Sequence, residues 1–211
     1  MFSEIRNPAT NQDEPLQFIR LRKDLWSTDS GIVNYLNLIY EANFAGEEVL
    51  AKVVPCSYGT NVHTHLAAKD MAPKLYATSN LHDLVSVVVM ELLVDGWTTL
   101  YNYRQNVHSR GIPEESRTRL LDRMEAILDC LKAKGMVHGD FRTANIMLKP
   151  GEEGKAMLID FDWAGEAGVA KYPFTRNDLG YPGKPGGFIA ATHDRTYYEE
   201  WKDEVFKPYT S

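Results

Sequence analysis

The sequence is poor in the features that mark several protein classes. It has only two cysteines in 211 residues, Cys56 and Cys130, which lie far apart in the chain. They cannot form a disulfide framework or a CxxC metal site, so we expect a reducing, intracellular compartment, namely the cytoplasm. The 15 glycines and 10 prolines are about the average for a soluble protein and follow no repeat, which excludes collagen-like and low-complexity chains.

An excess of positive charge and a long apolar run are also missing. The formal net charge is −6, so the chain has no global positive field that would attract nucleic acid or an anionic membrane. The most apolar stretch, 84–94, contains Ser86 and Glu91 and is too short to span a bilayer. Residues 1–15 have neither a signal-peptide nor a transit-peptide pattern. We therefore expect a soluble protein that binds neither nucleic acid nor membrane.

The residues that are present favour a folded chain with two differently patterned parts. A hydrophobic content of 44% and a charged content of 25% are ordinary for globular proteins, and the length fits one large domain or two small lobes. The first part predicts a small antiparallel sheet with one helix, after a polar opening that is expected to be frayed. The expected elements are strands at 16–26, 32–44, 49–54, 74–78 and 84–93, and a helix at 57–68.

Beyond residue 96 the apolar residues change to a helical period. Pro113 lies in the first turn of a segment whose apolar residues recur every three or four positions until Gly135. Short apolar stretches that follow predict small paired strands around a loop, then an irregular segment rich in proline and glycine, and a last helix. These elements are expected at 136–137, 146–148, 157–159, 172–187 and 194–206.

Two short motifs carry most of the functional information. His138-Gly139-Asp140 is followed, after four residues, by Asn145, and Asp160-Phe161-Asp162 follows the next apolar stretch. Phosphoryl transfer needs a carboxylate that orients the attacking hydroxyl and accepts its proton, and oxygen ligands for Mg²⁺. Asp140 suits the first role as catalytic base, and Asn145 and Asp160 suit the second as metal ligands. Any one of them alone would usually be a solvated turn residue, but their order between apolar strands favours catalysis.

These motifs resemble those of the protein-kinase-like superfamily. The glycine after the histidine is similar to the branch that contains aminoglycoside phosphotransferases, choline kinases and RIO kinases. The phrases Y-G-x-x-x-H at 58–63, A-P-K-L at 72–75 and F-D-W-A-G at 161–165 resemble compact kinase-like proteins that are expanded in fungi. The resemblance implies an α+β, two-lobe protein-kinase-like fold, with a small antiparallel N-lobe sheet at 1–93 and a truncated, mainly helical C-lobe at 94–211.

The resemblance also implies an ATP site. Arg142 matches the position at which many serine/threonine kinases carry a lysine against the transferring phosphate, and so joins the catalytic set. Lys52 matches the lysine that pairs with the α- and β-phosphates, although an edge-strand lysine that reaches water is the alternative from sequence alone. Met90, Glu91 and Leu92 look like the kinase hinge, whose main chain hydrogen-bonds adenine.

Three departures from the kinase pattern bear on activity. The expected helix has no acidic residue to pair with Lys52, and Asn61 or His63 stands in its place. The loop at 27–31 has a single glycine where a phosphate-covering loop has G-x-G-x-x-G. Asp162 stands where D-F-G has glycine, and it either joins the metal ligands or stiffens the turn. Nucleotide binding is therefore the step that these departures affect most.

Three hypotheses follow from these residues. The first is an enzyme that uses ATP and Mg²⁺ to transfer the γ-phosphate to a hydroxyl of a protein or a small molecule. The second is a catalytically impaired pseudokinase that acts as a nucleotide- or protein-binding module with a protein partner. The third keeps the fold but transfers the nucleotidyl group. The complete motif set favours activity, and the three departures favour the binding module.

Overall fold

The computed structural model describes residues 4–22, 38–55, 58–81, 85–107, 111–174 and 180–206. Contacts between residues divide the chain into two compact units. The first contains Met1–Thr60 and Pro73–Leu93, and the second contains Asn61–Ala72 and Val94–Ser211. The helix that interrupts the first unit in sequence therefore packs as part of the second.

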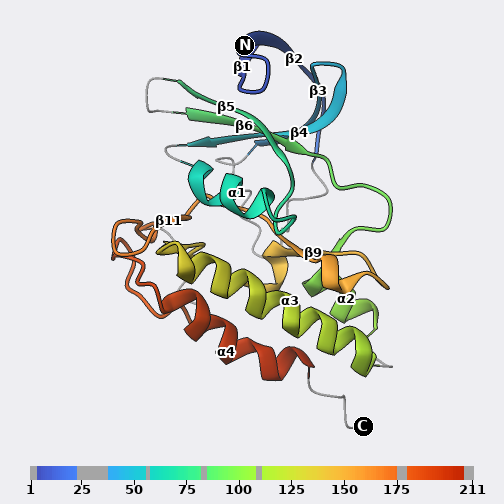
Figure 1. Cartoon of the computed structure of the whole chain (residues 1–211), viewed down its shortest axis with the longest axis vertical. Coiled ribbons are helices and arrows are strands. Elements are labelled where there is room, and N and C mark those ends of the chain that lie inside the picture. The colour runs from blue at the N-terminus through green and yellow to red at the C-terminus, as the bar shows by residue number, and fades with distance from the viewer. Residues whose placement is uncertain are drawn as a thin grey trace. The chain divides into compact units, whose positions relative to one another are not determined.

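The first unit is a six-stranded, fully antiparallel sheet with the strand order β1-β2-β3-β4-β6-β5 (Figure 1). The expected three-stranded meander corresponds to β2, β3 and β4, and the long apolar strand to β6. The loop at 27–31 and the adjoining ends of two expected strands lie outside the described residues. The strands are β1 (Glu4–Asn7), β2 (Gln12–Leu21), β3 (Leu38–Phe44), β4 (Glu47–Pro55), β5 (Leu75–Leu81) and β6 (Val85–Glu91).

The expectation of a frayed opening is wrong. β1 and β2 form a hairpin in which Ile5 lies opposite Glu14, and Ile5 is buried in the sheet's main apolar cluster. A single apolar side chain among polar neighbours is enough here, because strand side chains alternate between faces and only one face of β1 needs to be apolar.

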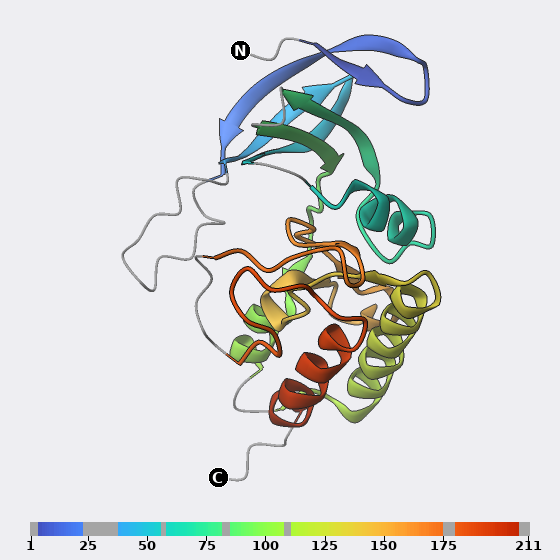
Figure 2. The ribbon, with the colours of Figure 1, turned by 90° about the vertical axis from the view of Figure 1, so that its left-hand side faces the viewer.

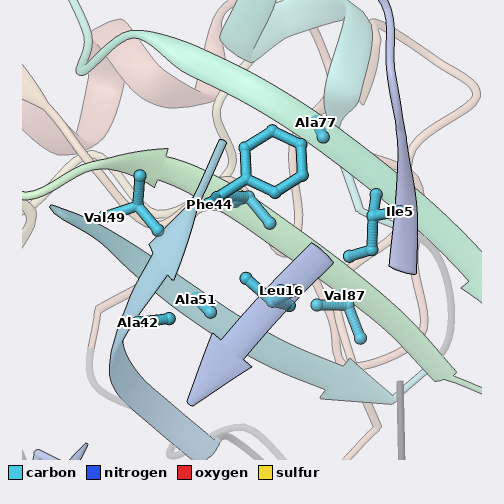
Figure 3. Close-up of a cluster of buried hydrophobic side chains, with 9 residues drawn as sticks. Ile5, Leu16, Ala42, Phe44, Val49, Ala51, Ala77 and Val87 are labelled. Carbon is cyan, nitrogen blue, oxygen red and sulfur yellow. The ribbon is translucent and has the colours of Figure 1, made fainter. Parts of the chain in front are cut away.

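Both faces of the central strands are buried. The larger cluster lies on one face (Figure 3), whereas Val54, Val88 and Met90 form a second cluster on the other, to which Leu50 also packs. Since neighbouring residues of a strand point to opposite faces, Lys52 of β4 shares the second face with Leu50 and Val54. The larger cluster contains Ile5, Leu16, Ala42, Phe44, Val49, Ala51, Ala77, Val87 and Val89.

The second unit is mainly helical. Its helices α3 and α4 lie side by side, as two views show (Figures 1 and 2). Two small sheets, β10-β9-β7 and β11-β8, hold the loops between the helices. The elements are α1 (Thr60–Ala67), β7 (Thr98–Thr99), α2 (Leu100–Asn106), α3 (Glu114–Ala133), β8 (Met136–Val137), β9 (Ile146–Leu148), β10 (Met157–Leu158), β11 (Gly165–Glu166) and α4 (His193–Phe206), with short 3₁₀ turns at Thr143–Asn145 and Glu153–Lys155.

The sequence pattern predicts α1, α3 and α4 correctly but misses β7, α2 and β11. The buried face of α3 is the predicted apolar stripe, and Gly135 follows its end with a φ of 64°. α2 is short, and its start depends on Thr99, whose hydroxyl accepts the N–H of Asn102 at 3.1 Å. No helix within the described ranges is both long and apolar enough to cross a membrane.

A buried carboxylate ties α3 to the turn that follows β9. Glu153 is 1% exposed, and its two oxygens accept the N–H of Gly151 at 2.9 Å and a guanidinium N–H of Arg119 at 2.9 Å. Burial raises the pKa of Glu153, but these hydrogen bonds to the charged form outweigh it, so the pKa lies below its usual value.

We expect this carboxylate to make stability depend on acid. Because its folded pKa is lowered, its contribution is complete above the unfolded pKa of about 4.3 and is lost as pH falls through the folded pKa. Glu153→Gln should lower the free energy of unfolding at pH 7 by about 1–3 kcal/mol, and by less at pH 4. Urea unfolding at both pH values checks this, with the exposed Glu166→Gln as control. An equal effect of Glu153→Gln at both pH values would contradict it.

Candidate active site

The first predicted motif forms a loop between β8 and β9 that is held from inside. The fully buried ring of His138 accepts the N–H of Asp140 at Nδ1 over 3.2 Å, while its Nε2 lies 3.0 Å from the carbonyl oxygen of Ile159. A carbonyl oxygen can only accept, so the proton is on Nε2 and the ring is neutral. With both nitrogens engaged, His138 positions the loop and is not available for proton transfer.

Asp140 lies at the centre of a hydrogen-bond network although it is only 5% exposed. Its Oδ2 accepts Nδ2 of Asn145 at 2.7 Å and lies 3.1 Å from Nε of Arg142. Its Oδ1 accepts the hydroxyl of Tyr181 at 2.5 Å. The structure thus brings together the three predicted residues of this loop, and adds Tyr181, which the sequence did not indicate because it lies 41 residues away in the proline- and glycine-rich segment.

The charges at this loop support each other. Partial burial lowers the pKa of the Arg142 guanidinium, whereas the negative charges of Asp140 and Asp160 raise it. The second effect is larger, so the pKa lies above its usual value. Arg142 is therefore held as a cation beside the carboxylate of Asp140. About 45% of its side chain remains exposed, which leaves it accessible to a ligand.

Asn145 presents an oxygen on the side away from Asp140. Its side-chain nitrogen donates to the carbonyl oxygen of Asp140 at 3.0 Å and to the carboxylate at 2.7 Å, so the amide oxygen points elsewhere. The N–H of Ile159 donates to the main-chain oxygen of Asn145 at 2.9 Å, which brings Asp160, the next residue, alongside. The two predicted metal ligands are therefore neighbours across the β9–β10 hairpin.

The donor set fits a hard cation that keeps other ligands. An amide oxygen and a carboxylate are ligands that Mg²⁺ accepts, and Mg²⁺ usually completes its six positions with water and phosphate oxygens. Among the residues that the structure describes, no group of three or more His, Cys, Asp or Glu could hold a metal by itself. Asn145 and Asp160 would hold Mg²⁺ together with water and phosphate oxygens.

The second motif packs through its phenylalanine. The buried ring of Phe161 is stacked on His63 of α1, with centroids 4.5 Å apart and an angle of 10°, and meets His138 edge-on at 5.1 Å. Asp160 has the positive φ of 68°, whereas Asp162 has none, so this position does not need the glycine of D-F-G. Whether Asp162 joins a metal site stays a prediction.

Asp194, in the first turn of α4, fixes the loop that contains His138 and Gly139, and the sequence did not indicate this contact. Its carboxylate accepts the N–H of His138 at 2.6 Å and that of Gly139 at 2.8 Å. The side chain is buried, and this burial raises the pKa of Asp194. An acidic residue at a helix start is commonplace, and no local pattern connects it to a loop 55 residues earlier.

Gly139 has a physical reason to be glycine. Its φ is 82°, and a Cβ atom there would lie 2.7 Å from Cδ1 of Ile189 and 3.1 Å from Cβ of Trp163. A side chain would be strained by the backbone and would also collide with two packed neighbours. The glycine of the H-G-D motif thus permits this tight packing of the loop.

The predicted nucleotide residues lie in the first unit. Lys52 is buried in β4, opposite Val88 of β6, and Met90 is buried two residues further along on the same face. Glu91 ends β6, and its N–H donates to the carbonyl oxygen of Lys74 at 2.8 Å. The N–H of Glu91 is therefore engaged within the first unit.

Comparison of the whole structure with solved structures identifies the fold. The structure of the Cydia pomonella granulovirus kinase PK-1 matches with a TM-score of 0.57 and 16% identity over 76% of this chain. Vaccinia related kinase 3 matches with a TM-score of 0.63 and 13% identity over 98% of this chain. The BubR1 kinase domain matches with a TM-score of 0.62 and 17% identity over 92% of this chain. The chain has the protein-kinase fold.

The chain spans only part of the length of these kinases. The chain spans 58% of the granulovirus kinase, 68% of vaccinia related kinase 3 and 62% of the BubR1 domain. Residues 71–172 match the sequence model of the lipopolysaccharide kinase (Kdo/WaaP) family, and this range contains both predicted motifs. No curated protein matches the chain in sequence. The α+β, kinase-like fold class expected from the motifs is confirmed.

The packing around Gly139 gives a direct test of this kinase loop. We expect Gly139→Ala to lower the free energy of unfolding by about 2–4 kcal/mol, since backbone strain and overpacking add. Gly168→Ala is the matched control, because Gly168 has a similar φ of 79° and a Cβ atom there would meet no other atom within 4 Å. Strain alone should cost about 1 kcal/mol there. Urea unfolding of both variants measures the difference, and equal losses would show that Ile189 and Trp163 yield without cost.

The contact between α4 and the loop gives a second test. Asp194→Ala leaves two buried N–H groups without their acceptor, so we expect the free energy of unfolding to fall by about 2–5 kcal/mol. Asp203→Ala, at an exposed position of the same helix, controls for the loss of one negative charge. Denaturant unfolding compares the two variants, and a difference below about 0.5 kcal/mol would contradict the role of Asp194.

Proposed function

We propose that this protein is a kinase-like phosphotransferase that moves the γ-phosphate of ATP, with Mg²⁺, to a hydroxyl of a protein or a small molecule. The observation that carries this proposal is the network at Asp140. A buried carboxylate is held between Asn145 and a cationic Arg142, and Asp160 lies close enough to raise the pKa of that arginine. This is the set of groups that phosphoryl transfer needs, in one place.

Each residue has one role in the proposed reaction. Asp140 orients the acceptor hydroxyl and takes its proton as the oxygen–phosphorus bond forms. Arg142 lies beside the carboxylate and offsets the negative charge of the phosphoryl group in transfer. Asn145 and Asp160 hold Mg²⁺, which neutralises charge on the β- and γ-phosphates when it is bound. His138, Gly139 and the buried Asp194 keep the loop in this geometry.

The first unit supplies the proposed nucleotide contacts. Lys52 shares a sheet face with the apolar side chains of Leu50, Val54 and Met90, so a cation and apolar surface occur together. The cation can bind phosphate oxygens, and the apolar surface can contact an adenine ring. We propose that the two units are the N-lobe and C-lobe of the kinase fold, with α1 packed as part of the latter.

The comparisons leave two classes of acceptor open, namely a hydroxyl of a protein and a hydroxyl of a small molecule or glycan. The matching sequence family is named for lipopolysaccharide kinases, which supports a small-molecule or glycan hydroxyl. The similar solved structures are the granulovirus kinase, vaccinia related kinase 3 and the BubR1 kinase domain. At 13–17% identity, their similarity to this chain shows the fold and says nothing about the acceptor. The fungal kinase-like branch suggested by the motifs is part of this proposal.

A second candidate function is a nucleotide- or protein-binding module without transfer. It is favoured by α1, whose sequence T-N-V-H-T-H-L-A has no acid and places His63 against Phe161 instead. Kinases use a helix carboxylate to orient the strand lysine, so Lys52 would be positioned differently here. Nucleotide binding with no release of ADP would favour this module. The third hypothesis, transfer of a nucleotidyl group, would instead be recognised by the release of pyrophosphate.

The decisive measurement is calorimetric titration of ATP with and without Mg²⁺, followed by an assay of ADP release. We expect Mg²⁺-dependent binding that Asp160→Ala abolishes, because that variant removes the charged metal ligand. Asp140→Asn should keep the binding and lower turnover about 100-fold or more.

The control for both variants is Asp122→Ala, an exposed carboxylate on α3 of the same unit. It should leave binding and turnover unchanged. Absence of binding at millimolar ATP would overturn the phosphotransferase proposal, and unchanged turnover in Asp140→Asn would overturn the role of Asp140.

A further inference from the structure

Both carboxylate oxygens of Asp140, the proposed base, make contacts in this state. Its Oδ2 faces Asn145 and Arg142, and its Oδ1 accepts the Tyr181 hydroxyl at 2.5 Å. A general base must be within about 2.6–3.2 Å of the hydroxyl whose proton it takes. The Tyr181 hydroxyl therefore stands in the position that an acceptor hydroxyl needs.

The ring of Tyr181 lies among other aromatic rings. It is stacked on Tyr197 of α4, with centroids 4.9 Å apart and an angle of 30°. It also lies 5.5 Å from the ring of Trp163 and 5.8 Å from that of Tyr172. Aromatic pairs at such distances attract each other beyond simple area burial. The space next to Asp140 is thus shaped for an aromatic ring whose hydroxyl points at a carboxylate.

The charge balance keeps this hydroxyl as a donor. Burial and the negative charge of Asp140 raise the pKa of Tyr181, so the phenol stays protonated at neutral pH. Tyr197, although stacked beside it, makes no hydrogen bond to Asp140 within the described part of the chain. The contact with the base is therefore specific to Tyr181.

We propose that the acceptor position at Asp140 is a phenol-binding subsite, which the chain's own Tyr181 fills in this state and which an aryl hydroxyl acceptor fills once Tyr181 has moved away. The acceptor class is a phenol, carried either by a tyrosine side chain or by a small aromatic molecule. The catalytic part of this inference rests on the proposed phosphotransferase function, but the binding part does not.

The corresponding transfer step is balanced. The phenol oxygen forms a bond to the γ-phosphorus as the bond from that phosphorus to the β,γ-bridging oxygen breaks. ADP leaves with that electron pair, and the phenol proton passes to Asp140. Asp140 then releases this proton to water, and the regenerated carboxylate repels the negatively charged aryl phosphate, which favours its release.

Binding to Tyr181→Ala tests the subsite without any need for ATP. Removing the side chain leaves a phenol-sized space, and such engineered cavities bind small aromatic molecules. Ligand-observed NMR should show that p-cresol binds this variant at least about tenfold more tightly than toluene, since only p-cresol can donate to Asp140. Tyr181→Phe keeps the ring in place and should bind neither. Tyr197→Ala keeps the Tyr181 hydroxyl on Asp140 and should show no preference for the hydroxyl.

Loss of stability in Tyr181→Ala does not remove the test. A ligand that binds only the folded chain raises its unfolding midpoint, so p-cresol should restore folding, as measured by circular dichroism, more than toluene does. Equal effects of the two ligands, or no effect of either, would overturn the phenol subsite.

Turnover then separates this inference from the proposed function. With Mg²⁺ and ATP, Tyr181→Ala should convert p-cresol to cresyl phosphate faster than the wild type does. Comparable transfer to N-acetyl-tyrosinamide would support tyrosine side chains as the source of the phenol, and transfer to p-cresol alone would support small aryl molecules. Faster transfer to N-acetyl-serinamide than to either would overturn the phenol assignment. Selective p-cresol binding without any transfer would leave the subsite standing and overturn the phosphotransferase proposal.

Discussion

The buried carboxylate of Asp194 is the contact on which the site depends. It accepts two consecutive N–H groups of the loop between β8 and β9, those of His138 and Gly139, and so fixes the main chain immediately before Asp140. Gly139 is in the left-handed region, with a φ of 82°, so the loop follows no regular element here and its N–H groups depend on the side chain of Asp194 for their acceptor. Helix α4 also holds the loop at a second point, since Nε1 of Trp201 donates to the carbonyl oxygen of Phe141 at 2.9 Å.

Once the loop is fixed, the groups around Asp140 constrain each other. Asn145 can direct its oxygen outward only because both of its amide hydrogens are used on Asp140. His138 can support the loop only in its neutral form, with its second nitrogen on the chain that leads to Asp160. A network in which each donor has an acceptor is rigid, and rigidity is what positioning for phosphoryl transfer requires.

The chain departs from the kinase pattern where α1 meets the second motif. His63 is buried and stacked on Phe161, in a position where the sequence offers no acid. Ring stacking can hold this helix to the motif without charge, so the packing of α1 does not need an ion pair. In the proposed function, Lys52 therefore lacks the helix carboxylate that orients the strand lysine of kinases, which is why a binding module stands as the second candidate function.

The kinase-like fold class came from the resemblance of the two motifs to those of kinases. Sequence patterns determined the strands β2 to β6 and the helices α1, α3 and α4, because side-chain alternation and helical period repeat within a few residues. The same holds for Asp140, Arg142 and Asn145, which a single loop brings together. The hairpin β1–β2 was missed because its first strand has a single buried apolar residue, Ile5. Helix α2 was missed because it is short and its start depends on one capping residue, Thr99.

Only the tertiary structure decided that Asp194 and Tyr181 belong to the site. They lie 54 and 41 residues from Asp140, in a helix start and in an irregular segment, and no spacing rule connects such positions. The need for glycine at position 139 likewise depends on Ile189 and Trp163, which fold back onto it from later in the chain. Local patterns record which residues can form an element or a loop, whereas the partners of a buried polar group are chosen by packing between elements.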